Sequence, residues 1–267
     1  MPHLGRTCEG IPIMSATRLD GRRIIITGGA SGMGEGLVRA FPALGAQVVA
    51  MDLNQDAGDA IAAAVGVEFV AVDVSSKDSV DQAFASAVQH LGGLDVLIHA
   101  AGIAPSSSAE SNTVELWNRV MGVNALGTML ANQAAFTHMA QSGGQILNFG
   151  SAAGIIGQPN KSVYSASKGA VTAWSRTAAK EWASRNITVN VIAPAIWTPM
   201  YDKTRSEMSP EQLAAHDAMM MTAVPIGGRL GDIEKDFVPV LAFYASEGAR
   251  FMTGQVISID GGTLMVR

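Results

Sequence analysis

The sequence predicts a doubly wound, Rossmann-like α/β fold, in which helices flank one parallel seven-stranded sheet within a single domain. The length of 267 residues lies in the range of one such domain. The strand-like runs are continuously apolar rather than alternating, which is typical of strands buried on both faces of a parallel sheet. Strand-like and helix-like runs also alternate along the chain, and this order favours right-handed crossovers.

Seven short runs have the composition of buried strands. They are Arg23–Thr27, Gln47–Asp52, Glu68–Val74, Asp95–Ala100, Gln145–Phe149, Thr188–Ile192 and Gln255–Ile259. The segments between them repeat apolar residues at helical spacing. The predicted helices are Gly34–Leu44, Gln55–Ala64, Lys77–Leu91, Val114–Ala140, Ser162–Arg185 and Ile233–Ala245.

Two segments lie outside this alternation. Residues 1–18 carry no periodic pattern and are predicted to form a flexible N-terminal arm, so the Rossmann-like domain would cover residues 19–267. Residues 197–231 separate the sixth strand from the last helix, and a connection of this length in a compact domain is more often functional than plain. Because it follows the carboxyl end of a strand, where open α/β sheets bind ligands, we predict that it is a substrate lid.

The composition argues against several classes of protein. The net charge is -5, which disfavours binding to nucleic acid or to acidic lipid. No run of 18 or more apolar residues occurs, so no membrane span is predicted. Cys8 is the only cysteine, which excludes an intramolecular disulfide and favours a cytoplasmic location. The five histidines lack the spacing of metal ligands, so no metal is predicted.

A glycine-rich turn joins the first strand to the first helix. It reads Thr-Gly-Gly-Ala-Ser-Gly-Met-Gly over residues 27–34. Glycines allow a pyrophosphate to approach the backbone, and the helix N-terminus offers N–H groups to the anion. No Lys-Ser or Lys-Thr follows, so an ATP-type phosphate loop is excluded. The alternative is a tight strand-to-helix turn without a ligand.

Asp52 ends the second strand, about 20 residues after the glycines, where a carboxylate accepts hydrogen bonds from an adenosine ribose 2′-hydroxyl. The same carboxylate would repel a 2′-phosphate, and Leu53 rather than a cation follows it. These residues favour NAD over NADP. The alternative for Asp52 is a strand-end turn residue or a helix cap.

Tyr164 and Lys168 are four residues apart at the start of a predicted helix, so they share one face of it. A phenolate at pH 7 costs roughly 4 kcal/mol. A cation at about 4 Å with an effective dielectric near 20 supplies up to roughly that amount. The pair can therefore make Tyr164 an acid/base for an alcohol and ketone couple. The alternative is a solvated pair on the helix surface.

These residues, together with others in the same order, resemble the classical short-chain dehydrogenase/reductase family over roughly residues 19–264. The shared pattern comprises Thr27-Gly28-x3-Gly32-x-Gly34, Asn124, Ser151, Tyr164-x3-Lys168 and Asp260-Gly261-Gly262. The resemblance implies the Rossmann-like fold, a dinucleotide cofactor and a homotetramer assembled through the tyrosine-bearing helix and the C-terminal strand.

The resemblance also implies a role for each matching residue. Tyr164 would be the acid/base, Lys168 would also hold the nicotinamide ribose, and Ser151 would hydrogen-bond the substrate oxygen. Asn124 would position a water that completes a proton relay through Lys168. The cofactor contacts predicted from the motif and the resemblance together are Gly28, Ser31, Gly32, Met33, Gly34, Asp52, Leu53, Asp73, Val74, Ala101, Gly102, Tyr164, Lys168, Pro194, Ile196 and Thr198.

The chain departs from the family pattern at three places. His99-Ala100 stands where the family commonly has Asn-Asn, so we expect one side-chain tie to be missing, and His99 itself to be a packed core imidazole. Pro194-Ala195 replaces Pro-Gly, with one residue fewer before Thr198. Gly150 stands where the family often has Ser. None of these removes a group that proton transfer needs.

The sequence therefore predicts an NAD(H)-dependent oxidoreductase that interconverts a secondary alcohol and a ketone, with a small and moderately apolar substrate. One alternative is an NADPH-dependent 3-oxoacyl-carrier-protein reductase. Another is a non-catalytic dinucleotide-sensing protein, against which the intact set of Asn124, Ser151, Tyr164 and Lys168 argues. The methionines at 200, 208 and 219–221 are either an adaptable wall over the substrate or ordinary packing.

Overall fold

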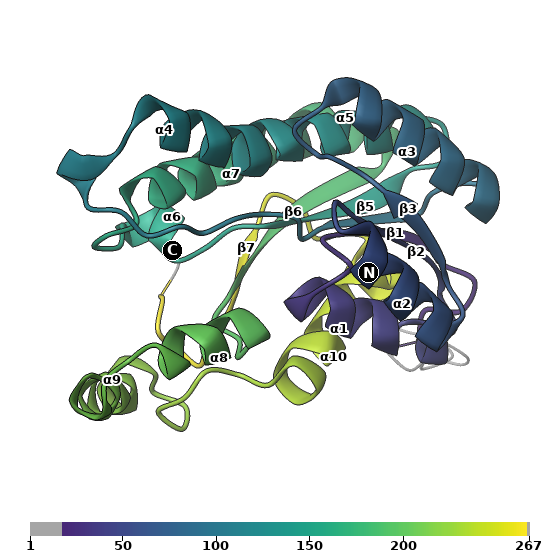
Figure 1. The fold of residues 1–267 in the computed structure, drawn as a ribbon. Helices are drawn as coiled ribbons and strands as arrows, with labels where there is room; N and C mark the ends of the chain where they lie inside the picture. The colour runs from purple at the N-terminus through teal and green to yellow at the C-terminus, as the bar shows by residue number, and fades with distance from the viewer. Residues whose placement is uncertain (1–17, 266–267) are drawn as a thin grey trace, which may run out of the picture.

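The computed structural model describes residues 18–265, and a seven-stranded parallel sheet forms its centre (Figure 1). The strand order is β3-β2-β1-β4-β5-β6-β7, the doubly wound order expected from alternating strands and helices. The strands are β1 (Arg23–Thr27), β2 (Gln47–Asp52), β3 (Glu68–Ala71), β4 (Val96–His99), β5 (Gly144–Phe149), β6 (Ile187–Pro194) and β7 (Val256–Ile259).

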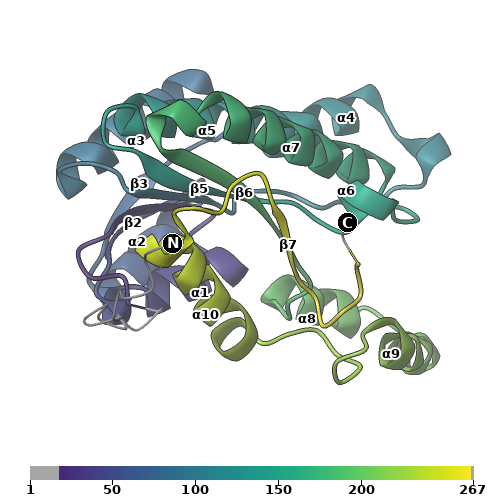
Figure 2. The ribbon, with the colours of Figure 1, turned by 180° about the vertical axis from the view of Figure 1, so that it is seen from behind.

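Helices cover both faces of the sheet (Figures 1 and 2). Helices α3, α5 and α7 pack on one face and α1, α2 and α10 on the other, each over its own apolar cluster. The helices are α1 (Gly32–Ala40), α2 (Gln55–Val65), α3 (Lys77–Leu91), α4 (Val114–Met121), α5 (Gly127–Met139), α6 (Ala153–Ile156), α7 (Ser162–Glu181), α8 (Pro199–Ser206), α9 (Pro210–Ala223) and α10 (Val238–Ala245). The predicted single α/β domain is confirmed.

The predicted helix 114–140 is interrupted by a π-helical turn, Gly122–Leu126, between α4 and α5. The physical cause lies in Asn124, whose buried side chain bonds both backbone groups of Ile103 on the neighbouring connection. Gly127 follows the turn, and a Cβ there would lie only 3.0 Å from Val74. The π-helical turn thus directs the Asn124 side chain toward Ile103, and Gly127 allows the helix to lie close to Val74.

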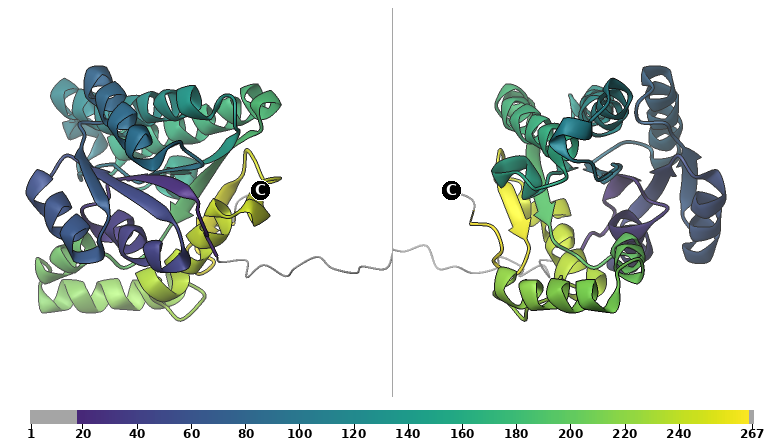
Figure 3. Two further views of the ribbon diagram at one scale, coloured as in Figure 1. Left: turned by 90° about the vertical axis from the view of Figure 1, so that its right-hand side faces the viewer. Right: turned by 60° about the vertical axis from the view of Figure 1, so that its left-hand side comes forward.

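The segment 197–231 contains two helices, α8 and α9, on the same side of the sheet as α1 and α10 (Figure 3). The start of α9 has a capping box, in which the Ser209 hydroxyl and the Gln212 side chain each bond the other's backbone N–H. The predicted N-terminal arm lies outside the described residues except for Arg18. Among residues 18–265, no helix is long and apolar enough to cross a membrane.

Candidate active site

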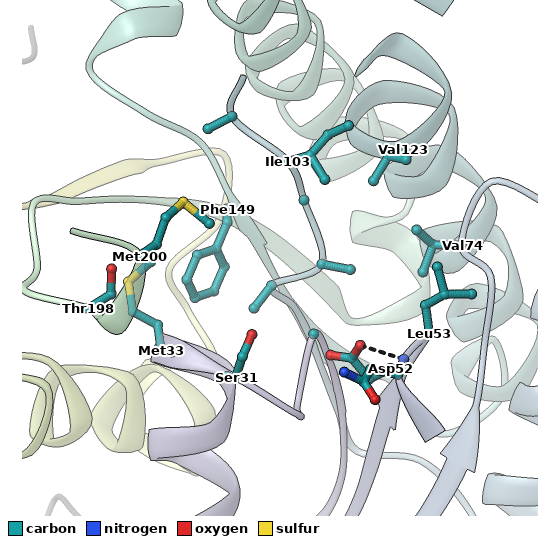
Figure 4. A pocket seen from close by; sticks show the side chains of 18 of the residues that line it. Ser31, Met33, Asp52, Leu53, Val74, Ile103, Val123, Phe149, Thr198 and Met200 are labelled. Carbon is teal, nitrogen blue, oxygen red and sulfur yellow. Dashed lines mark hydrogen bonds between the residues drawn. The ribbon is translucent and has the colours of Figure 1, made fainter. Parts of the chain in front are cut away.

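A cavity of about 820 Å³ opens at the carboxyl ends of the central strands (Figure 4). This edge of an open parallel sheet is where such folds bind their ligands, and the volume is typical of small-molecule sites. Fifteen of the predicted site residues line the cavity together. They are Gly28, Ser31, Gly32, Met33, Gly34, Asp52, Leu53, Asp73, Val74, Ala101, Gly102, Tyr164, Lys168, Pro194 and Thr198.

The glycine turn packs so tightly that two of its glycines, Gly28 and Gly34, have no room for a Cβ atom. Gly28 has φ of 69°, and a Cβ there would lie 2.7 Å from the backbone nitrogen of Ala101. A Cβ on Gly34 would lie 2.1 Å from the carbonyl oxygen of Gly28. The N-cap of α1, Ser31, makes no side-chain capping bond. The turn therefore presents bare backbone and an uncapped helix N-terminus to the cavity, which fits a pyrophosphate.

Asp52 lies at the end of β2 with its carboxylate fixed by two backbone donors. Its Oδ2 accepts from the N–H of Ala30 at 3.1 Å and its Oδ1 from the N–H of Asn54 at 3.0 Å. Among the residues that line the cavity, Lys168 is the only lysine or arginine. The region around Asp52 therefore fits a ribose with free hydroxyls and offers no cation to a 2′-phosphate.

Tyr164 and Lys168 lie on one face of α7 and both line the cavity. The Nζ atom of Lys168 is 5.8 Å from the centroid of the Tyr164 ring and donates to the carbonyl of Phe149 at 2.7 Å. The Lys168 residue is 5% exposed. The structure thus brings the expected phenol and ammonium together beside the glycine turn.

Burial dominates the electrostatics of this pair. It lowers the pKa of Lys168 to about 8. It also raises the pKa of Tyr164 above its ordinary value, while the nearby Ser151 hydroxyl opposes that rise. At pH 7 the tyrosine is therefore a neutral proton donor and most Lys168 side chains are ammonium ions. The sequence shows the charge of Lys168 but not its burial, and burial has the larger effect on both pKa values.

Ser151 follows β5 directly, beside the cavity-lining Gly150. Its hydroxyl accepts the N–H of Ala153 at 3.1 Å, which fixes the side chain at the start of α6. The residue is not part of the cavity lining. The Ser151 hydroxyl lowers the pKa of Tyr164, which opposes part of the rise that burial causes.

Asn124 is fully buried and does not line the cavity. Its Oδ1 accepts from the N–H of Ile103 at 2.8 Å, and its Nδ2 donates to the carbonyl of Ile103 at 2.9 Å and to Ser167 Oγ at 3.0 Å. The side chain therefore holds the connection after β4, whose residues form one wall of the cavity. The backbone carbonyl of Asn124 accepts a hydrogen bond from the Thr128 hydroxyl at 2.6 Å.

Ile196 is the predicted cofactor residue that the structure separates from the cavity. Its side chain is buried in the apolar cluster beneath α10, and its backbone forms a bridge with Gly231. Pro194 and Thr198, on either side of it, do line the cavity.

Several apolar residues line the cavity that the sequence reasoning did not name. Phe149 lies in the middle of the group, facing Met33 and Met200 in Figure 4. Its only sequence signal is its place two residues before Ser151. The other lining residues that were not predicted as site residues are Asn54, Val72, Ala100, Ile103, Ala104, Val123, Gly150 and Pro199.

His99 corrects one expectation, because the side-chain tie thought to be missing is present. Its Nδ1 lies 2.9 Å from Thr27 Oγ1, which also accepts the N–H of Ala101 at 3.3 Å. As expected, His99 is a core imidazole, 1% exposed. Burial, aided by the charge of Lys168, lowers its pKa to about 3, so the ring is neutral. The tie joins β1 to β4 just below the glycine turn.

The methionines divide between the two interpretations. Met200 on α8 lines the cavity, whereas Met220 and Met221 on α9 line a separate hollow of about 450 Å³. Arg205 joins the two helices, because it pairs with Asp217 and its guanidinium lies 5.1 Å from the Trp197 ring. Of the methionines in residues 197–231, Met200 therefore lines the site, whereas Met220 and Met221 do not.

Comparisons with known proteins agree with this geometry. The family model described as enoyl-(acyl carrier protein) reductase matches residues 28–263. A 3-oxoacyl-acyl-carrier-protein reductase of Thermotoga maritima is 36% identical over 255 residues, covering 93% of this chain and 100% of the relative. The 2-(S)-hydroxypropyl-CoM dehydrogenase 3 of Xanthobacter autotrophicus is 35% identical over 257 residues, covering 92% and 98%.

A solved structure supports the same relationship. The short-chain type dehydrogenase/reductase from Mycobacterium ulcerans has a TM-score of 0.85 and 27% identity, covering 92% of this chain and 90% of that one. Sequence, fold and the grouping of Tyr164 and Lys168 beside a glycine turn therefore agree. The chain belongs to the short-chain dehydrogenase/reductase family, whose members use NAD(P) to interconvert alcohols and ketones.

Proposed function

We propose that the protein interconverts a secondary alcohol and a ketone with NAD(H), and that Tyr164 is the general acid/base. One observation carries this proposal: the neutral phenol of Tyr164 and the buried ammonium of Lys168 face the same cavity as the glycine turn and Asp52. A dinucleotide that binds along this cavity supplies or accepts the hydride, and the protein contributes orientation and one proton.

The chemical roles follow from where each group lies. During ketone reduction the Tyr164 hydroxyl gives its proton to the substrate oxygen, which Ser151 orients by hydrogen bonding. The ammonium of Lys168 stabilises the phenolate left behind, and the same ammonium holds the nicotinamide ribose. Asn124 positions the water through which Lys168 regains a proton for Tyr164, and its side chain also fixes the Ile103 wall.

We propose NAD rather than NADP as the preferred cofactor. The Asp52 carboxylate suits a ribose 2′-hydroxyl and would repel a 2′-phosphate, and the cavity lining holds no cation other than Lys168. NADPH-dependent reduction of 3-oxoacyl groups on a carrier protein is the second candidate. The similarity to the Thermotoga maritima reductase favours it.

The walls around the substrate position are largely apolar. Ile103 and Ala104 come from the connection after β4, and Met200 comes from the proposed lid, residues 197–231. These residues support a moderately apolar ketone or alcohol of small size as substrate. The family resemblance supports a homotetramer through α7 and β7. The lone cysteine supports a cytoplasmic location.

Steady-state assays with a panel of ketones and alcohols test this proposal, with the nicotinamide absorbance as the signal. We expect turnover of some secondary alcohols or ketones, and a higher kcat/KM with NAD(H) than with NADP(H). Faster turnover of 3-oxoacyl-carrier-protein substrates with NADPH would support the second candidate instead. Tight NAD binding without turnover of any alcohol or ketone would indicate a dinucleotide sensor.

A further inference from the structure

A second lysine lies near Tyr164 and has no part in the proposed proton transfer. Lys161 immediately precedes α7, three residues before Tyr164 and seven before Lys168. Positions spaced by three and four residues share a helix face. Lys161 is the N-cap of α7 and lies about one turn before Tyr164, at the end of the helix that brings Tyr164 and Lys168 to the cavity.

The ammonium of Lys161 reaches the wall of the cavity. It donates to the carbonyl of Ala104, which lines the cavity on the connection after β4. The residues on either side dock the same connection: the Asn160 carbonyl accepts the N–H of Ser107 at 2.9 Å, and Ser162 Oγ accepts from Asn112 at 2.6 Å. Lys161 thus lies between Ala104, which lines the cavity, and the first turn of α7.

This ammonium has no acidic partner within the described part of the chain. None of the ion pairs among residues 18–265 includes Lys161. The residue is half-buried, and burial lowers its pKa from the ordinary value without any charged neighbour contributing. An ammonium has three donors, of which Ala104 takes one. Charges taken partly out of water are usually paired, so a partner of opposite charge is expected here.

We propose that Lys161 is a specificity-determining residue that binds a carboxylate on the substrate, about one helical turn, roughly 5 Å, beyond the reacting carbon. This inference rests on the proposed function, because it places the reacting carbon at Tyr164. Lys161 is not itself among the lining residues, and the lining residues Ile103 and Met200 are apolar. The preferred substrate is accordingly a small oxo acid or hydroxy acid with an apolar body and one carboxylate at its far end.

Paired acids and esters test this role on the full-length protein with NADH. The probes are 4-oxopentanoate and 5-oxohexanoate, each beside its methyl ester, so that two chain lengths are covered. For at least one length we expect kcat/KM to favour the acid by roughly tenfold or more, the value of a hydrogen bond to a charged group. The preference should come from KM, because Lys161 holds the substrate without taking part in proton transfer.

Three variants isolate the contribution of the charge. Lys161→Met keeps the aliphatic stem, and we expect it to remove the preference for the acid while leaving the kinetics of the ester nearly unchanged. Lys161→Arg should retain the preference, because the guanidinium also binds carboxylates. Lys180→Met is the matched control on the exposed face of α7 and should behave as wild type.

Two kinetic results would overturn the inference. One is a wild-type enzyme that turns over the esters at least as well as the acids. The other is an equal loss for acid and ester in Lys161→Met, which would show that Lys161 only ties the Ala104 wall to α7.

Calorimetric titration of the same acids into the protein with NADH separates this inference from the proposed function. Binding of an acid that Lys161→Met abolishes, without turnover of acid or ester, would support the carboxylate site and refute the proposed reaction. Turnover of the esters without any Lys161-dependent binding of the acids would uphold the reaction and refute the carboxylate site.

Discussion

Lys168 donates a hydrogen bond from Nζ to the carbonyl of Phe149 at 2.7 Å, joining α7 to the end of β5. Phe149 is itself fixed from below, because its ring packs against Phe237 with centroids 5.8 Å apart. The ammonium is thus held by the end of a strand rather than by a mobile loop. Because Tyr164 lies one turn away on the same helix, its position is fixed as well. The arrangement has a cost, since a positive charge lies in a nearly dry interior.

That cost predicts how stability changes with pH. The pKa of Lys168 is about 8 in the folded protein against 10.5 for the free group. Between these values the unfolded chain holds a proton that the folded chain has lost, so stability rises with pH. In the cofactor-free protein, we expect the unfolding free energy of wild type relative to Lys168→Met to increase by up to about 3 kcal/mol from pH 7.5 to 10.5. Denaturant unfolding measures this difference.

The comparison with Lys168→Met cancels the titration of the other lysines and tyrosines. Lys180→Met, on the exposed face of α7, is the control for exchanging a lysine for methionine in the same helix. A difference for Lys168→Met that does not change with pH would show that the lysine is not held in a low-dielectric site.

Removal of the Tyr164 hydroxyl tests the proton transfer itself. Since a positioned general acid contributes roughly 10²–10⁴-fold, Tyr164→Phe should lower kcat by that factor and leave NAD binding nearly unchanged. Turnover and NAD affinity by fluorescence titration are the two measurements. Tyr244→Phe removes a hydroxyl from α10, outside the cavity lining, and should leave both unchanged. Wild-type turnover in Tyr164→Phe would refute the assignment.

Much of the fold was predictable because parallel strands buried on both faces leave a strong apolar signal. The bounds of β1 and β2, and of α3, agree with the prediction residue for residue. The helix 114–140 was predicted as continuous, because its π-turn depends on contacts between Asn124 and Ile103, which are 21 residues apart. Such long-range contacts do not alter the local periodicity of the sequence.

Some residues of the candidate site were also predictable from the sequence, and others were not. Glycines, Asp52 and the tyrosine and lysine pair carry polar chemistry that is recognisable from spacing, and the structure gathers them at one cavity. Phe149 resembles an ordinary core residue in sequence, so only the fold reveals that it lines the cavity. For Met200 the sequence left open a wall over the substrate or ordinary packing, and the fold shows that it lines the cavity. Ile196 shows the reverse case: its position in the motif pointed to the cofactor, and packing turns its side chain into the core.

The cofactor preference depends on the charge of Asp52. Asp52→Ala should lower the ratio of kcat/KM for NAD to that for NADP by roughly tenfold or more, because a hydrogen bond to a charged group and a repulsion are both lost. Asp52→Asn is the matched variant, since its amide oxygen can still accept a backbone N–H while the charge is gone. Steady-state kinetics with both cofactors give the ratio, and a ratio unchanged in both variants would exclude the ribose contact.

The buried imidazole of His99 makes the protein sensitive to acid. Its pKa is lowered from 6.5 to about 3 by burial first and by the charge of Lys168 second. Below pH 6.5 the unfolded chain binds a proton that the folded chain cannot, so stability falls as the pH falls. His99→Leu escapes this loss but gives up the hydrogen bond to Thr27, which costs about 1–3 kcal/mol at neutral pH.

The difference between wild type and His99→Leu should therefore shrink in acid. From pH 6.5 to pH 5 we expect wild type to lose about 2 kcal/mol relative to the variant. Urea unfolding at several pH values measures the two curves. His90→Leu, near the C-terminal end of α3, is the control for exchanging an exposed histidine for leucine. Parallel curves for wild type and His99→Leu would mean that the folded protein accommodates a charged imidazole beneath the glycine turn.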